Sequence, residues 1–352
     1  MESKSGQKRP RRGAPSPSPG RRPANLVLGP GLATKELSRL LAVDRPYSPL
    51  RQELYSPAEL MAGFNPRALD SSLDDRIYLH AQRHGRNRGR RPKLAEALAQ
   101  RVHDFSIDEA LERLLDRGPD GLARAKKLVG VMGGHEARRG SPWYRRTAQT
   151  GRLLARAGYH VVSGGGPGLM EAANLGAYLA QETEAALTAA IDRLELAADF
   201  DRTDIATTAR YVAAAREILA RHPDGAENLA VPTWFYGHEP TNLFATRIAK
   251  YFSNSLREDG LLALASYGVV FAPGSAATRQ EIFQNAAQNH YALSQWCSPM
   301  VFLGREVYGP RSGLYSVVRA AANANYRELL CLTDDPRAVV EFLEAHPPQR
   351  HR

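Results

Sequence analysis

The chain has 352 residues and a formal net charge of +10, and 43% of its residues are hydrophobic while 24% are charged. These proportions are ordinary for a globular protein, and no apolar run approaches the roughly 20 residues that a membrane span needs. The N-terminus lacks the apolar region of a secretory signal, and two cysteines, Cys297 and Cys331, exclude a disulfide framework or a four-cysteine zinc site, so we expect a cytoplasmic protein without a membrane partner.

The positive charge is concentrated in two short segments. Residues 1–23 carry a net charge of +6, and the run RHGRNRGRRPK at 83–93 adds six basic residues without an acid. Such segments are typical of a contact with nucleic acid or another polyanion, or of a solvated tail and a basic surface loop. Neither segment interleaves aromatic residues that stack on bases, which favours the second interpretation. We therefore do not expect nucleic acid as a partner.

The first third of the chain is predicted to lie outside the main domain. Residues 1–31 are rich in Pro, Gly, Ser and Arg and contain few apolar residues, which predicts a disordered basic tail. Between residues 32 and 125, apolar residues recur at helical spacing in TKELSRLLAV and PKLAEALAQRVHDFSIDEALERLLDR. This spacing predicts a helical accessory region.

At Lys127 the pattern changes to strands that alternate with helices. The apolar runs KLVGVMGG and YHVVSGGG predict buried parallel strands, and a helical stretch follows each of them. The first of these helices has Ser141 as its cap, Pro142 at an early position and Gly158 at its end. The alternation predicts an α/β domain at 126–345 with a doubly wound parallel sheet, which is a Rossmann-like fold.

Two further helices are predicted to interrupt this domain. The segments ETEAALTAAIDRLELAADF and DIATTARYVAAAREILARH predict an inserted helical hairpin at about 181–227. The sheet is expected to resume in NLAVPTWFYG, YGVVFAPG and SPMVFLG. The helix DPRAVVEFLEAH is expected to end the ordered chain.

Two glycine-bearing turns combine the features of an anion site. The first, Gly164–Gly168 in SGGGPGLMEAAN, follows a predicted strand and opens into a helix, so backbone N–H groups and the positive end of the helix dipole converge there. The second is APGSAATRQEIF at 272–283, in which Glu281 lies three residues after Thr278. Glu281 either forms a capping box with Thr278 or acts on a ribose beside a bound phosphate. Neither turn has the spacing of a dinucleotide fingerprint or a P-loop.

In chain order, the segments VGVMGG, GSPWY, GGGPGLME and PGSAATRQE resemble the Lonely Guy superfamily of nucleotide-binding proteins over about residues 127–345. This superfamily includes cytokinin-activating phosphoribohydrolases, bacterial nucleotide 5′-monophosphate nucleosidases and lysine decarboxylase-like proteins. The resemblance implies a nucleoside monophosphate or related nucleotide as the partner and a homodimer or higher homo-oligomer. We expect no cofactor and no metal, because such hydrolysis requires no metal and the sequence has no cluster with metal-ligand spacing. Nothing in the chain resembles a pyridoxal phosphate site, which argues against a decarboxylase.

The family motifs, carried over by position, imply the candidate site. Glu281 is the expected catalytic carboxylate, and Arg257 the expected catalytic cation. Substrate contacts are expected from Gly133, Gly134, Gly164, Gly165, Gly166, Gly168, Glu171, Gly274, Ser275, Ala276, Ala277 and Thr278. The chain departs from the family where Ser275 and Ala277 replace glycines and Glu258 replaces a lysine after Arg257. A Cβ at Ala277 narrows the space for a phosphate and disfavours a positive φ.

Three functions follow as hypotheses. The first is a nucleoside 5′-monophosphate phosphoribohydrolase, which hydrolyses the N-glycosidic bond and releases the base and ribose 5-phosphate while Glu281 stabilises positive charge on the ribose. The alternative, suggested by Ser275 and Ala277, is a non-hydrolytic nucleotide sensor of the same fold. The third is a nucleic-acid-associated protein that binds through its basic N-terminal segments.

The stretch WFYGHEPTNLFATRIAKYF at 234–252 permits two interpretations. It concentrates aromatic and polar residues, namely Trp234, Tyr236, His238, Glu239, Asn242 and Arg247. It either overhangs the carboxyl edge of the sheet and stacks a base, or forms a partly buried loop that packs on the inserted hairpin.

Overall fold

The computed structural model describes residues 41–84, 92–237, 239–291 and 295–351. Residues Val43–Arg352 form one compact unit. The predicted basic tail, most of the helix predicted at 34–43, the centre of the basic run at 83–93 and His238 lie outside the described residues.

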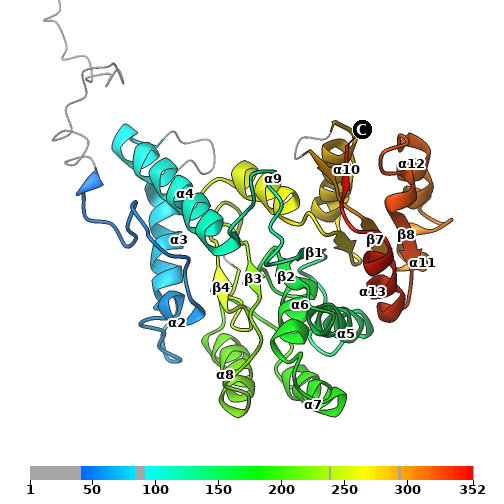
Figure 1. The fold of residues 1–352 in the computed structure, drawn as a ribbon. Coiled ribbons are helices and arrows are strands. Elements are labelled where there is room, and N and C mark those ends of the chain that lie inside the picture. The colour runs from blue at the N-terminus through cyan, green and yellow to red at the C-terminus, as the bar shows by residue number, and fades with distance from the viewer. Residues whose placement is uncertain (1–40, 85–91, 238, 292–294, 352) are drawn as a thin grey trace, which may run out of the picture. The chain divides into compact units, whose positions relative to one another are not determined.

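A parallel sheet forms the centre of the molecule (Figure 1). Among the described residues it has seven strands in the order β4-β3-β2-β1-β5-β7-β8, and each neighbouring pair is parallel. The strands are β1 Leu128–Met132, β2 His160–Ser163, β3 Leu229–Ala230, β4 Arg247–Ile248, β5 Val269–Phe271, β7 Met300–Leu303 and β8 Leu330–Thr333. The chain moves from β1 to one edge and returns beside β1 to build the other, which confirms the predicted doubly wound α/β fold.

Helices precede, connect and follow the strands. From the N-terminal side they are α2 Pro57–Leu60, α3 Leu73–His84, α4 Leu94–Leu115, α5 Pro142–Arg156, α6 Leu169–Tyr178, α7 Glu184–Glu195, α8 Ile205–Arg221, α9 Asn254–Leu264, α10 Ala276–Tyr291, α11 Arg305–Tyr308, α12 Leu314–Ala321 and α13 Pro336–Ala345, with a 3-10 turn at Arg327–Leu329. None of the helices in the described part of the chain is long and apolar enough to cross a membrane.

The core follows from the alternation of side chains along the strands. Val129 and Val131 of β1 point to one face, where side chains of α5, α6 and α13 such as Leu154, Ala173 and Leu343 bury them. Helix α5 begins as predicted, because the Ser141 hydroxyl accepts a hydrogen bond from the backbone N–H of Tyr144 and proline occupies the first helical position. Burial on both faces makes the strands continuous apolar runs.

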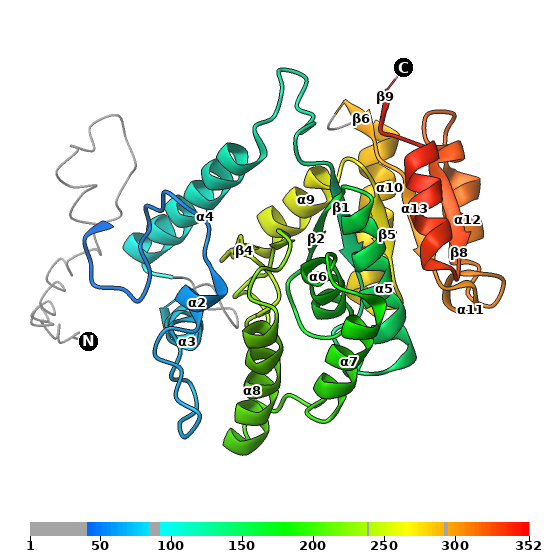
Figure 2. The same cartoon turned by 60° about the horizontal axis from the view of Figure 1, so that its bottom comes forward.

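The predicted inserted hairpin is confirmed as α7 and α8, which lie together at one end of the molecule (Figure 1). The N-terminal helical region lies at the β4 edge of the sheet, while α12 and α13 lie at the β8 edge (Figure 2). Tyr55 of this region forms an antiparallel bridge with Ile248 of β4. The N-terminal region therefore covers an edge that would otherwise offer unpaired backbone groups.

Several features differ from the predictions. Helix α3 and the strands β4 and β8 were not predicted; prolines precede the helix, and β4 has only two residues. The chain does not end its ordered part at α13, since β9 (Gln349–Arg350) pairs antiparallel with β6 (Trp296–Cys297). The capping box between Thr278 and Glu281 does not form, because α10 begins at Ala276 and places Thr278 inside its first turn.

Candidate active site

The loops that follow β2, β1 and β5 meet at the carboxyl edge of the sheet, because these strands are neighbours in the order β2-β1-β5. The peptide of Gly134 joins the other two loops. Its N–H donates to the carbonyl of Pro273 at 2.8 Å, and its carbonyl accepts the N–H of Leu169 at 3.0 Å. The predicted turns at Gly164–Gly168 and at 272–283 therefore share one rim, as the sequence led us to expect.

Polar side chains of Ser163 and Asn174 hold the loop at Gly164–Gly168 in place. Ser163 accepts the N–H of Gly165 at 3.0 Å and donates to Asn174 at 2.6 Å, and Asn174 donates in turn to the carbonyl of Leu229 at 3.1 Å. The four glycines are buried. A Cβ added at Gly164 would overlap the Arg257 guanidinium, so the absence of a side chain there makes room for another residue of the protein.

The turn after β5 is the more open side of the rim. Ser275, Ala276 and Ala277 are exposed, whereas Thr278 is buried and packs against Gly274. Helix α10 starts here with 16 residues, and the N–H groups of its first turn have no acceptor within the helix. Neither Ser275 nor Ala277 has a positive φ. The backbone strain expected from replacing the family glycines is therefore absent.

Glu281 and Arg257 face each other across this rim. Glu281 is 8% exposed, and its Oε1 lies 3.8 Å from Nη1 of Arg257. Arg257 donates from Nε to the carbonyl of Val231 at 2.7 Å and from Nη2 to the carbonyl of Gly164 at 3.1 Å. A single guanidinium thus links the end of β3, the first glycine turn and the carboxylate on α10.

The Glu281 carboxyl holds its proton more tightly than a carboxyl in water. Burial raises its pKa from 4.5 to about 7, while Arg257 lowers the pKa and Glu258 raises it. A group with this pKa exchanges a proton near neutral pH, which suits either protonation of a leaving group or stabilisation of positive charge.

Residues 126–206 match the family model described as the SLOG cluster4 family. This segment is therefore similar to that family. The match confirms the resemblance to the Lonely Guy superfamily, and the SLOG segment, residues 126–206, carries the first two loops of the rim.

Two solved structures are similar to part of this chain. A molybdenum cofactor binding protein from the phototrophic bacterium Rippkaea orientalis is 14% identical with a TM-score of 0.39, and the similarity covers 63% of this chain and 98% of that chain. The Moco carrier protein from Chlamydomonas reinhardtii is 17% identical with a TM-score of 0.38, over 62% of this chain and 98% of that chain. No curated protein matches the chain.

Within the SLOG segment, Glu171 has a different environment from the other predicted contacts. Its buried carboxylate accepts hydrogen bonds from Arg139 at 2.5 and 2.8 Å, from the Tyr144 hydroxyl at 2.9 Å and from the Tyr211 hydroxyl at 3.1 Å. These partners tie α6 to α5 and to α8 of the inserted hairpin. All four hydrogen bonds to the Glu171 carboxylate come from the protein itself. A contact between Glu171 and a substrate therefore stays a prediction.

Neither predicted role, a base-stacking loop or a buried loop packed on the inserted hairpin, describes the whole aromatic stretch at 234–252. Trp234 is 1% exposed and donates from its indole N–H to Asp74 at 2.7 Å, so it packs on the N-terminal helical region and cannot stack on a base. Tyr236 is 51% exposed, and its hydroxyl accepts a hydrogen bond from Asn254 at 2.9 Å. Among the described residues of this stretch, the exposed ones such as Tyr236 remain available to a ligand.

Two neighbours of the site, Glu258 and Glu239, stand out in the sequence but were not predicted as site residues. Glu258 accepts a hydrogen bond from Asn254 at 2.8 Å and contributes to the raised pKa of Glu281. Glu239 would meet a Cβ added at Gly166, which places it beside the first glycine turn. Glu258 was noted only as a departure from the family lysine, and its charge next to Arg257 was the available signal.

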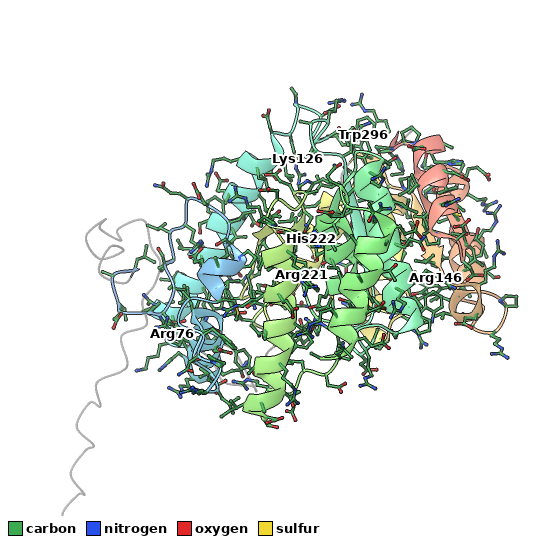
Figure 3. All side chains as sticks on the ribbon, turned by 90° about the horizontal axis from the view of Figure 1, so that it is seen from below. Arg76, Lys126, Arg146, Arg221, His222 and Trp296 are labelled. Atoms are coloured by element: carbon green, nitrogen blue, oxygen red, sulfur yellow. The ribbon has the colours of Figure 1, made fainter. Side chains whose placement is uncertain are left out.

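Four basic residues outside the rim lie far from one another. Arg76, Lys126, Arg146 and Arg221 belong to separate parts of the chain and are spread across the molecule (Figure 3). In the parts of the chain that the structure describes, no group of three or more His, Cys, Asp or Glu residues is arranged to hold a metal ion.

Proposed function

We propose that the protein is a nucleoside 5′-monophosphate phosphoribohydrolase. Water adds to C1′ of the ribose, the N-glycosidic bond breaks, and the base leaves with the bonding electrons and takes up a proton. The products are the free base and ribose 5-phosphate. The match of residues 126–206 to a SLOG family and the shared rim of the two glycine-bearing turns support this proposal.

The exposed turn at 275–277 is the proposed phosphate site. Its N–H groups stand at the start of α10, where unpaired donors and the helix dipole attract an anion. Thr278 adds a hydroxyl to the same turn. A phosphate held there places the ribose toward Glu281, one helical turn further along α10.

The observation that carries the proposal is the buried pair of Glu281 and Arg257. In its charged form the Glu281 carboxylate stabilises the positive charge that builds on the ribose as the bond breaks, and in a dry site this stabilisation is stronger than in water. Arg257, 3.8 Å from Glu281, is the group proposed to stabilise the departing base or the phosphate.

The test is release of free base from a panel of nucleoside 5′-monophosphates. We expect turnover by the wild type, and a loss of about 10²- to 10⁴-fold in kcat for Glu281→Gln, because the variant keeps the shape of the side chain and removes its charge. Glu136→Gln is the matched control, since the Glu136 side chain is 80% exposed in the loop after β1. No base released from any monophosphate would refute the proposal.

A non-hydrolytic nucleotide-binding protein is the second candidate. The Arg257 guanidinium already donates hydrogen bonds to the carbonyls of Val231 and Gly164. This favours the second candidate, because an arginine held by the protein has fewer donors for a departing base or a phosphate. Calorimetry with mono-, di- and cyclic nucleotides separates the two, because a sensor binds without turnover. The homodimer or higher homo-oligomer implied by the family resemblance is likewise a proposal, which sedimentation of the purified protein tests.

A further inference from the structure

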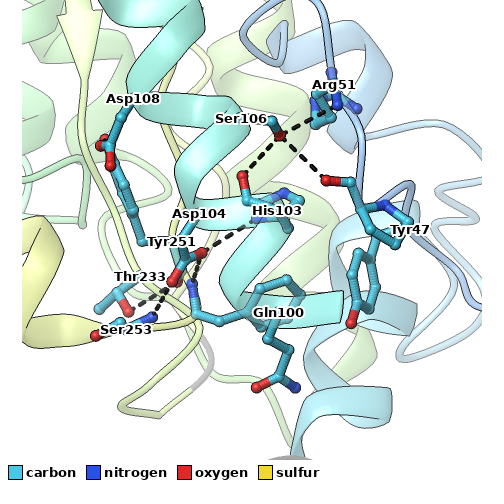
Figure 4. Close-up of polar contacts among 12 residues, drawn as sticks. Tyr47, Arg51, Gln100, His103, Asp104, Ser106, Asp108, Thr233, Tyr251 and Ser253 are labelled. Atoms are coloured by element: carbon cyan, nitrogen blue, oxygen red, sulfur yellow. Dashed lines mark hydrogen bonds and ion pairs between the residues drawn. The ribbon is translucent and has the colours of Figure 1, made fainter. Parts of the chain in front are cut away.

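Asp104 lies on α4, in the N-terminal helical region, and holds the start of α9 (Figure 4). Its side chain is 1% exposed. Oδ1 accepts the backbone N–H of Phe252 and Oδ2 accepts the backbone N–H of Ser253, each at 2.9 Å. A carboxylate from outside the α/β part of the chain therefore binds the backbone just before a helix of the candidate site.

This contact anchors the start of α9, which has no side-chain capping bond of its own. Ser253 is the N-cap of α9, and its own hydroxyl makes no capping hydrogen bond. The first N–H groups of a helix have no acceptor within it, and a negative charge near them is favourable. Asp104 satisfies the N–H of Ser253, while the carbonyl of Ser253 accepts the N–H of Arg257 at 3.2 Å and closes the first turn.

A second acidic residue, one turn further along α4, holds the same segment. Asp108 accepts a hydrogen bond from the Tyr251 hydroxyl at 2.7 Å. The carbonyl of Tyr251 accepts the N–H of Trp234 at 2.9 Å and the hydroxyl of Thr233 at 3.0 Å. Residues 251–253 are thus fixed between α4 and the chain that leaves β3, where the Val231 carbonyl accepts Nε of Arg257.

Asp104 is itself held in place from the interior of the N-terminal region. His103 Nδ1 lies 3.2 Å from Oδ1 of Asp104, and Nε2 lies 2.8 Å from the Tyr55 hydroxyl. Burial lowers the pKa of His103, so the ring is neutral. Because a carboxylate only accepts hydrogen bonds, the ring proton lies on Nδ1, and the Tyr55 hydroxyl donates to Nε2.

We propose that Asp104 is a positioning residue for Arg257, and that the N-terminal helical region completes the active site by fixing the first turn of α9. This inference rests on the proposed function for its catalytic consequence. Displacing the start of α9 moves the Arg257 guanidinium away from Glu281 and from the Gly164 carbonyl. A shift of about 1 Å at such a group is enough to lower turnover strongly.

The variant Asp104→Asn tests the proposal in the full chain. The amide keeps the size of the carboxylate but turns an N–H donor toward one of the two backbone N–H groups, so one of them loses its acceptor. Ser106→Ala is the matched control. Ser106 is buried on the same helix, and its hydroxyl contacts Arg51, Pro49 and His103, all within the N-terminal region.

Two measurements are made on both variants. Hydrogen exchange of peptides spanning 250–264 is expected to speed up at least about tenfold in Asp104→Asn and to stay unchanged there in Ser106→Ala. Base release from the nucleoside monophosphate that the wild type cleaves fastest is expected to fall about tenfold or more in Asp104→Asn. In an Arg257→Ala background, the same substitution is expected to cause no further loss, because it acts through the missing arginine.

Unchanged exchange at 250–264 in Asp104→Asn overturns the inference. An equal loss of activity in the presence and absence of Arg257 also overturns it, since a general loss of folding acts in both backgrounds. A wild type that releases no base refutes the proposed function alone, and the exchange experiment then decides whether Asp104 fixes α9.

Discussion

At the scale of single residues, Arg257 organises the candidate site. Its guanidinium donates to carbonyls at the ends of two strands and lies 3.8 Å from the Glu281 carboxylate. Arginine suits this position because its planar fork presents several donors in fixed directions, which a lysine does not. A Cβ at position 164 would overlap this guanidinium, so part of the glycine-rich motif leaves room for the protein's own side chain.

The raised pKa of Glu281 predicts a pH-dependent cost to folding. The folded protein holds a proton on this carboxyl up to about pH 7, whereas the unfolded chain releases it near pH 4.5. The wild type therefore loses stability as the pH rises through this window, while a glutamine does not titrate. We expect Glu281→Gln to match the wild type near pH 4.5 and to exceed it by up to about 3 kcal/mol at pH 8.

Urea denaturation of both proteins at pH 4.5 and pH 8 measures this difference. Glu136→Gln, in an exposed position, is the control and should parallel the wild type at both values. A constant offset between Glu281→Gln and the wild type across the range would show that the Glu281 proton is not linked to folding.

At the scale of elements, the contact between α5 and α6 sets how closely the first two strand–helix units pack together. Gly176 of α6 lies against the backbone of α5, where an added Cβ would overlap the Ala148 carbonyl oxygen and lie 2.9 Å from the Arg152 nitrogen. Backbone atoms of a helix cannot turn aside as a flexible side chain can. This contact therefore fixes the distance between the two helices.

Gly176→Ala is expected to destabilise the protein by about 1–3 kcal/mol, although alanine is the better helix former. The control is Gly260→Ala in α9, where an added Cβ meets no heavy atom within 4 Å. That substitution is expected to raise the free energy of unfolding by up to about 1 kcal/mol. Thermal unfolding checks both, and a rise in Tm for Gly176→Ala would contradict the prediction.

The elements that the sequence predicts are those with a local signal. The strands β1, β2, β5 and β7 are apolar runs that end in glycine or proline, and α5 carries its own cap. The paired turns and Glu281 could be found because each lies within one short motif. Asp104 could not, since its contact with Ser253 spans 149 residues and no local pattern marks it. The buried partners of Glu171 are hidden for the same reason.

At the scale of the whole molecule, the N-terminal helical region and the α/β part share a buried interior. Trp234 packs against Tyr55, His103 and Phe252, with ring centroids 4.7 to 5.8 Å apart. Asp74 of α3 accepts two hydrogen bonds from Lys250, at 2.8 and 2.9 Å, in the same interior. The separation at residue 125 that the sequence suggests stays a prediction, and this shared core argues that the two regions unfold together.

Trp234 reports on this shared core once Trp143 and Trp296 are replaced by phenylalanine. In urea, the fluorescence change of Trp234 is expected to coincide with the loss of helical circular dichroism, because separating the two regions exposes Trp234 and the Lys250–Asp74 ion pair. A fluorescence transition at clearly lower urea than the loss of helicity would show instead that the N-terminal region detaches first.

The two hydrogen bonds of the Gly134 peptide limit how far the loops of the rim can move apart when a ligand enters. The N–H and the carbonyl of this peptide are bound to opposite walls, at Pro273 and at Leu169. A ligand that displaced one of these two loops would have to move the other loop with it or break a hydrogen bond to the Gly134 peptide. We therefore expect the rim to keep its shape when the proposed nucleotide binds, so that the shape of the ligand decides selectivity.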